Sequence, residues 1–511
     1  MKNQSFFALL LLLVATACTS PTTKTTKQVN ILFIMSDDHS YQTISAYDDR
    51  YINTPNIDAL AKEGVLADRS YVSNSICGPS RAVMLTGKFN HINGMINNQV
   101  SFDASQATYP SILGENGYQT AIIGKWHLRN LPQNFGHYDI LVGQGDYYNT
   151  NFISKGDTTR SRGYVTDVIT DKSIDWLDKR DKNKPFCLLV HHKAVHRIWM
   201  PDTALLAEFK DTKFPLPHNF YDNYEGRKAA AHQQLNIENS LYLDYDLKML
   251  DDDEFKSIHN NAYKRMLNKL DTDARKAWND YYQPIIDELK DKKLSGRKLT
   301  EWKFQRYMQD YLACVRSLDN NIGRLIRHLK EIGEYDNTII VYTSDQGFYM
   351  GEHGWFDKRF MYEESFRTPL IIKIPEALGG RHKVIHDLVQ NIDYAPTFLD
   401  FAGVDIPTDM QGLSMKKLLD GTQVGEFRNS LYYHYYEYPN EHRVMKHYGV
   451  RDERYKLIHF YDPESFWELY DLKEDPNEMN NLYGKSEYET IRNTMKRKLD
   501  ELRVKYKDTE K

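Results

Sequence analysis

Four short apolar runs constrain the fold of this chain more than any other feature. Each is continuous enough to be a strand buried on both faces, which is typical of a parallel sheet. Helical periodicity lies between them, for example over Asn56–Glu63 and Ser111–Asn116. The four runs are Asn30–Met35, Thr120–Ile123, Phe186–Val190 and Thr338–Tyr342. The alternation predicts an α/β sandwich with a large, mostly parallel mixed sheet.

Polar side chains that can take part in catalysis or bind a ligand follow each of the four runs. The carboxyl ends of parallel strands meet at one edge of a sheet, and ligands bind there. Four endings with acids, lysine and histidine therefore point to one shared site, although His191 and His192 are expected to be structural histidines at a sheet end. The endings are Ser36-Asp37-Asp38-His39, Gly124-Lys125-Trp126-His127, His191-His192 with His196, and Thr343-Ser344-Asp345-Gln346.

A cysteine at the predicted start of a helix adds another group to this site. Pro79 suits the first turn, where a missing N–H costs nothing, and Gly87 suits the helix end. Cys77 then lies where free N–H groups and the helix dipole favour an anion, and Arg81 follows one turn later on the same face. The segment predicts a site for a tetrahedral oxyanion. The alternative is a buried cysteine before an ordinary helix.

The strand endings also offer ligands for a hard cation. Asp37, Asp38 and Asp345 supply carboxylates, and Gln346 supplies a neutral oxygen. Oxygen ligands suit Ca²⁺ or Mg²⁺. The sequence has no Cys/His cluster with the spacing of a structural zinc site.

Composition bears on the size of the core, the partners and the disulfides of the protein. The chain has 511 residues, 41% of them apolar, which is ample for a large core and more than one domain. A formal net charge of -5 argues against nucleic acid as a partner. The cysteines show no disulfide framework, and Cys187 and Cys314 are expected to be inert core residues.

The first residues predict export. Lys2 gives a positive start, and the apolar stretch Phe6–Ala17 is too short to span a bilayer. Small residues before Cys18 resemble a bacterial lipoprotein cleavage box, with plain secretion as the alternative. We therefore predict a signal peptide with a lipobox over residues 1–18 and a tether over 19–28. A lipid anchor at Cys18 would be the only membrane contact, in a Gram-negative bacterium, on the periplasmic side rather than the cell surface.

The rest of the chain divides into two predicted parts. Residues 29–424 form the catalytic domain, with a helical insertion over about 200–310. Residues 425–511 form a smaller α+β subdomain with an antiparallel sheet. Its strands are expected at Tyr455–Tyr461 and Glu468–Leu472, and a terminal helix at Tyr488–Lys505.

Three motifs resemble those of the type I sulfatases of the alkaline-phosphatase-like superfamily. The stretch from Cys77 to Gly87 matches the signature C-x-P-S-R-x-x-x-L-T-G without departure. Gly124-Lys125-Trp126-His127-Leu128 matches the second signature, and Glu468-Leu469-Tyr470-Asp471-Leu472 resembles the family's C-terminal subdomain. The resemblance runs from about Asn30 to Asn481.

The resemblance implies a modified nucleophile and a metal. In that family the signature cysteine is oxidised after translation to formylglycine (3-oxoalanine), so a maturation enzyme would act on Cys77. The hydrated aldehyde, a gem-diol, attacks the sulfur of the substrate. One Ca²⁺ would be bound by the modified Cys77 with Asp37, Asp38, Asp345 and Gln346, the last standing where many members have Asn.

The resemblance also assigns the remaining catalytic roles. Arg81, Lys125 and Lys358 would neutralise the sulfate. His127 would take a proton from the gem-diol, and His196 would protonate the leaving alcohol. The residue before His196 is Val, where the family usually has Pro.

The segment from Asp345 to Glu364 closely resembles the N-acetylglucosamine-6-O-sulfatases, which act on heparan-type glycosaminoglycans or sulfated O-glycans. It implies hydrolysis of 6-O-sulfate esters of N-acetylglucosamine, a sulfated carbohydrate being the substrate. The alternatives are 6-sulfated galactose or N-sulfated 6-sulfated glucosamine, a phosphatase or phosphodiesterase, and a non-catalytic glycan-binding lipoprotein. The candidates for contacts with the sugar are Asp357, Arg359, His442 and His447.

Overall fold

The computed structural model describes residues 28–251 and 254–508. The predicted signal peptide with Cys18, and all but the last residue of the predicted tether, lie outside the described residues. Within the described chain, a search for helices long and apolar enough to cross a membrane finds none.

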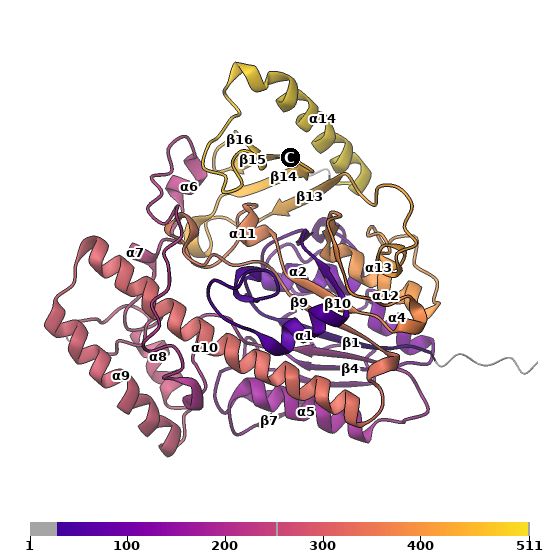
Figure 1. Cartoon of the computed structure of the whole chain (residues 1–511), viewed down its shortest axis with the longest axis horizontal. Coiled ribbons are helices and arrows are strands. Elements are labelled where there is room, and N and C mark those ends of the chain that lie inside the picture. Colours follow the sequence, from indigo (N-terminus) through magenta and orange to yellow (C-terminus); the bar gives the residue numbers. More distant parts are fainter. Residues whose placement is uncertain (1–27, 252–253, 509–511) are drawn as a thin grey trace, which may run out of the picture.

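A mixed sheet, ten-stranded within the described residues, forms the centre of the molecule (Figure 1). Its order is β11-β2-β10-β9-β1-β8-β4-β5-β6-β7. The strands from β9 to β5 in this order run parallel, and antiparallel pairs occur toward both edges. The predicted sheet is thereby confirmed. The strands are β1 (Asn30–Ser36), β2 (Val65–Ala67), β4 (Gln119–Gly124), β5 (His137–Leu141), β6 (Asn151–Ser154), β7 (Asp157–Arg160), β8 (Phe186–His191), β9 (Thr338–Ser344), β10 (Leu370–Lys373) and β11 (Lys383–Ile385).

The four predicted strands are the neighbours β9, β1, β8 and β4 at the middle of this sheet. Every residue of β1, β8 and β9 is buried, which explains their continuous apolar sequences. Their register brings the carboxyl ends level, because Met35 of β1 pairs with His191 of β8 and with Thr343 of β9. Gly124 of β4 pairs with the same His191. The four polar endings therefore meet at one edge.

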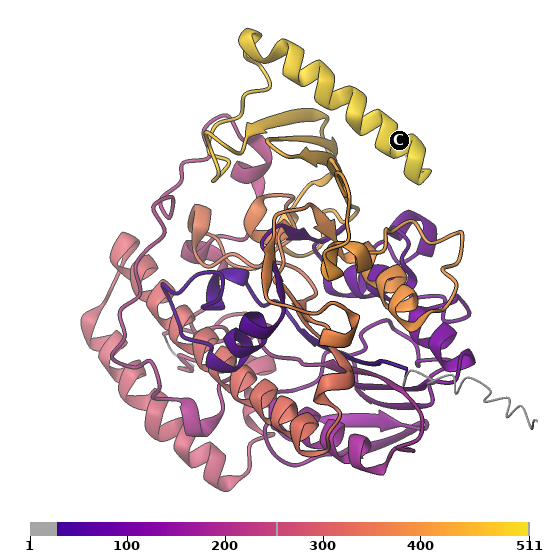
Figure 2. The ribbon, with the colours of Figure 1, turned by 45° about the vertical axis from the view of Figure 1, so that its right-hand side comes forward.

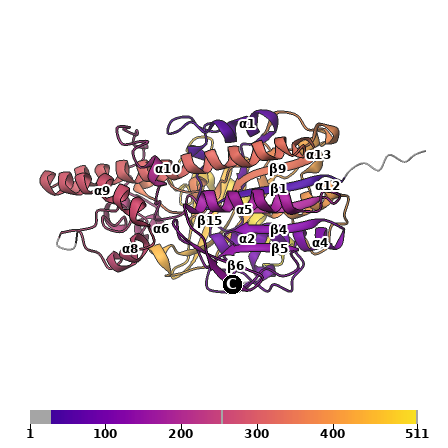
Figure 3. The ribbon, with the colours of Figure 1, turned by 90° about the horizontal axis from the view of Figure 1, so that it is seen from below.

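Helices cover both faces of the sheet and bury two separate apolar cores. Figure 3 shows α5 and α10 lying side by side along the sheet. The first face packs against α1 (Pro55–Glu63), α5 (Val165–Lys179) and α10 (Gly296–Glu331). The second face packs against α2 (Cys77–Thr86), α4 (Tyr109–Glu115), α12 (Tyr394–Ala402) and α13 (Lys416–Asp420). Cys187 and Cys314 are fully buried in these cores, as predicted.

Helices between β8 and β9 occupy the region predicted as an insertion. They are α6 (Lys228–His232), α7 (Ile237–Ser240), α8 (Asn260–Leu267), α9 (Thr272–Lys292) and α10. In Figure 1, α8, α9 and the first part of α10 project to the left of the sheet. The 36-residue helix α10 continues from this projection into the core, where it packs on α1 and α5.

The C-terminal part contains the predicted antiparallel sheet, in the order β13-β14-β15-β16. Helix α14 (Glu489–Tyr506) covers its outer face, as Figure 2 shows. The inner face packs aromatic side chains against the segment that follows β9. The strands are β13 (Ser430–Tyr435), β14 (Lys446–Asp452), β15 (Tyr455–Asp462) and β16 (Phe466–Asp471). The shorter elements are β3 (Ser70–Tyr71), β12 (Val389–Gln390), α3 (Asn90–Asn93) and α11 (Glu363–Phe366).

Candidate active site

Cys77 is the first residue of α2, as the sequence predicts, and only 1% of it is exposed. No side chain caps this helix start, and the N–H of Gly78 donates to Asn98 Oδ1 at 3.0 Å. A Cβ on Gly78 would lie 2.6 Å from Met95 Cε and 3.2 Å from the His127 carbonyl oxygen, so the start of α2 is closely packed. The Sγ of Cys77 lies 3.5 Å from the Lys358 ammonium. The helix start is thus an enclosed place for a negatively charged group.

Carboxylates from two strand ends surround Cys77. Ligand atoms of Asp37, Asp38, Asp345 and Cys77 all lie within 4.8 Å of one another. The Asp37 Oδ1 and Gln346 Oε1 atoms are buried and accept no hydrogen bond. Orphaned buried oxygens are costly without a partner, and oxygen ligands of this kind suit a hard divalent cation. The residues present therefore fit a metal site.

Burial and neighbouring charges shift the pKa values of these three acids. Burial raises the pKa of Asp38 to about 7, with Lys358 opposing and the other two carboxylates adding to the rise. Burial, together with Asp37, raises the pKa of Asp345 to about 6. Although burial acts in the same direction on Asp37, the charges of Lys125, Arg81 and Lys358 hold its pKa well below the usual value. A cation among the three would offset their repulsion.

Three buried cations complete the centre. Arg81 donates through Nε and Nη2 to Asp345 Oδ2, at 3.0 and 2.9 Å, and through Nη1 to the Lys125 carbonyl at 2.7 Å. Lys125 is paired with Asp37, and Lys358 with Asp38. The structure therefore gathers the predicted charged residues from four separate segments of the chain at one point.

Two histidines lie at this centre with different surroundings. Burial, reinforced by Lys125 and Arg81, lowers the pKa of His127, and its Nδ1 is buried with no hydrogen-bond partner. Its imidazole is therefore neutral near pH 7 and able to accept a proton. His196 Nδ1 lies 2.6 Å from the Arg197 carbonyl, while Nε2 lies 3.9 Å from Asp38 Oδ2. Its side chain is 18% exposed, so a substrate can reach it.

The other histidines of the third strand ending have structural surroundings. His191 is 2% exposed and His192 is 1% exposed. His191 Nδ1 lies 3.2 Å from the Lys125 carbonyl. The burial of both rings agrees with the structural role that the sequence predicts.

The predicted sugar contacts divide into two groups. Asp357 lies 3.0 Å from His442 Nε2, and Arg359 contacts Asp357 at 3.8 Å and Glu441 at 3.1 Å. Asp357, Arg359 and His442 all have positive φ, of 73°, 103° and 64°. Strained residues of this kind persist where the surroundings hold them, often at ligand sites.

His447 lies apart from this group. It is 0% exposed, the Met361 N–H donates to its Nε2 at 3.1 Å, and its Nδ1 lies 2.8 Å from the Met445 carbonyl. Its ring stacks on Phe360 and Tyr433. Both ring nitrogens are thus used inside the protein, so the structure gives His447 a structural role and we do not carry it into the sugar site.

Two tyrosines that sequence reasoning missed hold the site together. Tyr147 donates to the His196 carbonyl at 2.6 Å. Tyr433 donates to the Arg359 carbonyl at 2.6 Å and accepts from the Ser75 N–H at 3.2 Å, joining the C-terminal sheet to the segment before α2. Nothing in the sequence marks these two among 36 tyrosines.

The site agrees with what comparison with known proteins finds. The sulfatase family profile matches residues 29–404. The chain belongs to the sulfatase family. It is accordingly a sulfuric ester hydrolase with the alkaline-phosphatase-like fold. The profile of the C-terminal region of N-sulphoglucosamine sulphohydrolase matches residues 351–505.

Individual members of the family with stated activities are also similar to this chain. The chain is 49% identical over 502 residues to an N-acetylglucosamine-6-O-sulfatase of Bacteroides thetaiotaomicron, covering 97% of this chain and 89% of that protein. It is 25% identical over 481 residues to the N-acetylglucosamine-6-sulfatase of Bos taurus, covering 83% and 75%. A solved structure in complex with its substrate D-glucosamine-2-N,6-O-disulfate superimposes with a TM-score of 0.92 at 49% identity, covering 95% of this chain and 99% of that one.

Proposed function

We propose that this sulfatase removes the 6-O-sulfate ester from N-acetylglucosamine of host-type glycans, either heparan sulfate or sulfated O-glycans. The observation that carries the proposal is the meeting of Cys77, three carboxylates and three cations at one sheet edge, next to the Asp357–His442 pair. The relatives named for this reaction support the choice of sugar. N-sulfated 6-sulfated glucosamine is a second candidate, favoured by the substrate bound to the structural relative.

The proposed nucleophile is formylglycine made from Cys77 by a maturation enzyme. Burial, together with Asp37, raises the pKa of the Cys77 thiol, so little thiolate exists at neutral pH and an unmodified thiol would be a poor nucleophile. The perfect match to the signature motif supports the modification. Phosphatases of this superfamily use serine or threonine instead, which disfavours that alternative.

The proposed metal is one Ca²⁺. Asp37, Asp38, Asp345, Gln346 and the modified Cys77 would hold it, because their ligand atoms cluster and two of the oxygens lack partners. When bound, the ion would supply positive charge to the sulfate and to the nucleophile. Hard oxygen ligands favour Ca²⁺ or Mg²⁺ over zinc, and the family resemblance favours Ca²⁺.

The chain's own residues would then perform the chemistry. Lys125, Lys358 and Arg81 neutralise the sulfate oxygens inside a water-poor site, where such charges act strongly. His196 donates a proton to the departing sugar oxygen, because an alkoxide is a poor leaving group. His127, neutral in the resting protein, accepts the proton that must leave the nucleophile before sulfate is released.

The sugar itself would contact Asp357, Arg359 and His442. Asp357 is the residue before Lys358, so contacts to the ring and to the sulfate come from adjacent positions. A primary 6-sulfate projects from the ring, which allows it to reach a buried sulfate site while the ring stays at the rim. A carboxylate, a guanidinium and an imidazole supply the hydrogen-bonding groups that sugar hydroxyls need.

Sulfate release tests the proposal directly. Protein matured in its native host would be assayed on 6-sulfated N-acetylglucosamine, N-sulfated 6-sulfated glucosamine and 6-sulfated galactose, and on the matching phosphate ester. We expect activity on the glucosamine substrates and loss of that activity in Cys77→Ala. Intact-mass analysis of the Cys77 peptide should show the replacement of sulfur by oxygen. A preference for the phosphate ester would contradict the proposal, and an unmodified thiol in inactive protein would favour a non-catalytic glycan-binding protein.

The amino-terminal sequence supports export as a lipoprotein anchored through Cys18, on the periplasmic side of a Gram-negative bacterium. Labelling with radioactive palmitate tests this. Incorporation should be lost in Cys18→Ala, and labelling that persists in that variant would contradict the lipid anchor.

A further inference from the structure

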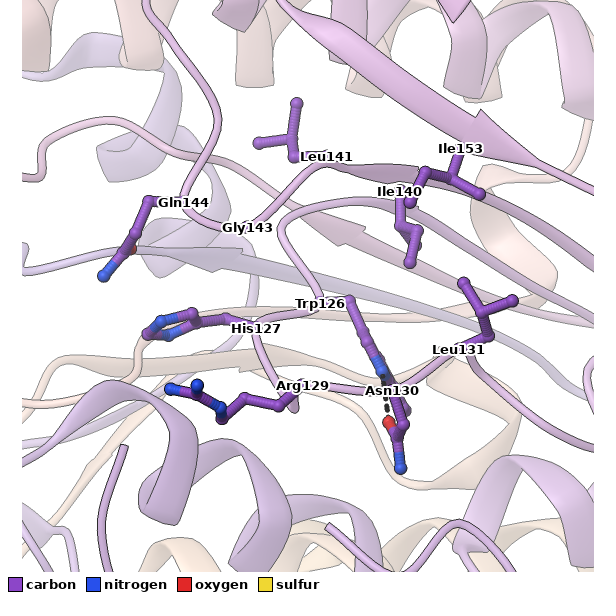
Figure 4. A pocket seen from close by; sticks show the side chains of 10 residues that line it. All are labelled: Trp126, His127, Arg129, Asn130, Leu131, Ile140, Leu141, Gly143, Gln144 and Ile153. Carbon is purple, nitrogen blue, oxygen red and sulfur yellow. Dashed lines mark hydrogen bonds between the residues drawn. The ribbon is translucent and has the colours of Figure 1, made fainter. Parts of the chain in front are cut away.

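A cavity lies directly beside the catalytic centre, over β5 and β6. Its volume is about 600 Å³, within the range of roughly 300–1,000 Å³ usual for small-molecule sites. The loop from Trp126 to Leu131 forms one wall, and Gly143 and Gln144 after β5 form another (Figure 4). His127, which the proposed mechanism uses, lines this cavity as well. The cavity therefore continues the active site along the carboxyl edge of the sheet.

The two ends of the cavity differ in chemistry. In Figure 4 the side chains of His127, Arg129 and Gln144 lie at the left of the view, and apolar side chains lie at the right. Ile140 and Ile153 face each other across β5 and β6 and form an apolar floor. An apolar surface beside a few polar groups suits one face of a sugar ring, with its hydroxyls toward the polar end.

Arg129 brings positive charge to the polar end of the cavity. Among the described residues, neither Arg129 nor Lys193 forms an ion pair with an acid. Arg129 donates to the Asn98 carbonyl at 2.8 Å, which leaves most of its five N–H donors available. Lys193 is 5% exposed, and its ammonium donates to the Gln144 carbonyl at 3.2 Å. An unpaired guanidinium at the end of a cavity favours an anionic ligand.

Arg129 is also fixed relative to the reacting centre. Asn98, whose carbonyl accepts from Arg129, accepts through its side chain from the Gly78 N–H at the start of α2. Arg129 and His127 both have positive φ, of 60° and 58°, so the loop turns sharply twice within three residues. One residue, Asn98, therefore separates the guanidinium from the helix that carries Cys77.

We infer that this cavity binds the sugar unit next to the 6-sulfated glucosamine, and that Arg129 contacts a carboxylate or sulfate on that neighbouring unit. The inference rests on the proposed function and sharpens it, because it selects acidic glycosaminoglycan fragments over neutral O-glycans. Lys193 would act as a positioning residue by holding the main chain of Gln144. Arg129 would set substrate preference without taking part in bond breaking.

Kinetics on three substrates test the inference. They are 6-sulfated N-acetylglucosamine alone, the same sugar linked to a uronic acid, and the same sugar linked to galactose. We expect the wild-type protein to have the highest kcat/KM on the acidic disaccharide. Arg129→Ala should lower that value about tenfold to a hundredfold, the scale of a lost hydrogen bond to a charged group, with little change on the other two substrates.

A pair of variants at Leu131 tests the same inference without altering Arg129, in case Arg129→Ala disturbs its loop. Leu131 lines the cavity and is 42% exposed, so substitutions there leave the core intact. Leu131→Glu should repel the acidic disaccharide, whereas the neutral Leu131→Gln should not. Arg162→Ala, at an exposed arginine outside the cavity, serves as the control for loss of positive charge.

The possible outcomes distinguish a failure of the inference from a failure of the proposed function. Equal wild-type values on the acidic and neutral disaccharides would overturn the inference while leaving the proposed function intact. An equal loss on all three substrates in Arg129→Ala would also overturn it, because Arg129 would then serve the reaction itself. Absence of wild-type activity on every 6-sulfated glucosamine would instead refute the proposed function.

Discussion

Removal of the Lys358 ammonium tests the proposed site most directly. Lys358 lies 3.5 Å from Cys77 Sγ, pairs with Asp38 and is only 3% exposed. Two unit charges about 4 Å apart interact by about 4 kcal/mol at an effective dielectric constant of about 20. Such a loss in the transition state corresponds to about a thousandfold in rate, and loss of one preorganised donor usually costs about 10²–10³. We therefore expect Lys358→Ala to lower kcat/KM on 6-sulfated N-acetylglucosamine by about 10²–10³.

The measurement is sulfate release under conditions of limiting substrate. Lys358 lies far in sequence from the signature motif, so maturation of Cys77 should be unaffected, and the mass of the Cys77 peptide verifies this in each preparation. Lys358→Arg should retain part of the activity. Lys446→Ala, at a partly exposed lysine paired with Asp462, is the control that should match the wild type. A loss smaller than tenfold in fully converted Lys358→Ala would refute the assignment of this lysine to the sulfate.

Three further predictions follow from the same structure. His196→Ala should lower kcat on a sugar sulfate by about 10²–10⁴ but affect an aryl sulfate much less, because a phenolate leaves without a proton; comparison of the two substrates decides this. Chelation of divalent ions should lower the thermal midpoint through repulsion among Asp37, Asp38 and Asp345, Ca²⁺ should restore it, and an unchanged midpoint would count against a metal. Burial raises the pKa of Glu468 from 4.5 to about 7, so the folded state binds this proton more tightly and stability falls as pH rises through that window. Glu468→Gln should remove this dependence and stabilise the protein above pH 7 by up to about 3 kcal/mol, and parallel melting curves for the two proteins across pH 4–8 would contradict the argument.

The central sheet could be predicted because its signal is local. A run such as Thr338–Tyr342 has a β-branched or aromatic residue at every position, a pattern that at this length indicates a strand buried on both faces. The meeting of Asp37, Asp345 and Lys125 followed from the rule that parallel strands end together. Asp37, Asp345 and Lys125 could therefore be placed from their positions after strands. Cys77 and Arg81 belong to helix α2, and Lys358 follows β9 at a distance, so their placement needed the signature motif and the family resemblance.

Residues supplied by the C-terminal sheet could not be placed in this way. His442 and His447 look alike in a Tyr/His-rich sequence, yet His442 follows β13 in a loop and His447 lies within β14. Because of its position in β14, the His447 side chain points toward a cluster of aromatic rings. The segment after β13 places His442 next to Asp357. That difference depends on the docking of one sheet on another segment, which no local pattern records.

The C-terminal sheet is part of the catalytic unit because it fixes the segment that carries Lys358. Lys456 of β15 donates to the Met361 carbonyl at 2.7 Å, and Tyr362 donates to Glu468 of β16 at 2.9 Å. The same segment begins at Asp345, one of the three carboxylates clustered at Cys77. Lys358 is therefore held from both directions, by the large sheet before it and by the small sheet after it. Loss of the C-terminal sheet should thus abolish sulfate binding as well as sugar selection, since neither Lys358 nor Arg359 would keep its position.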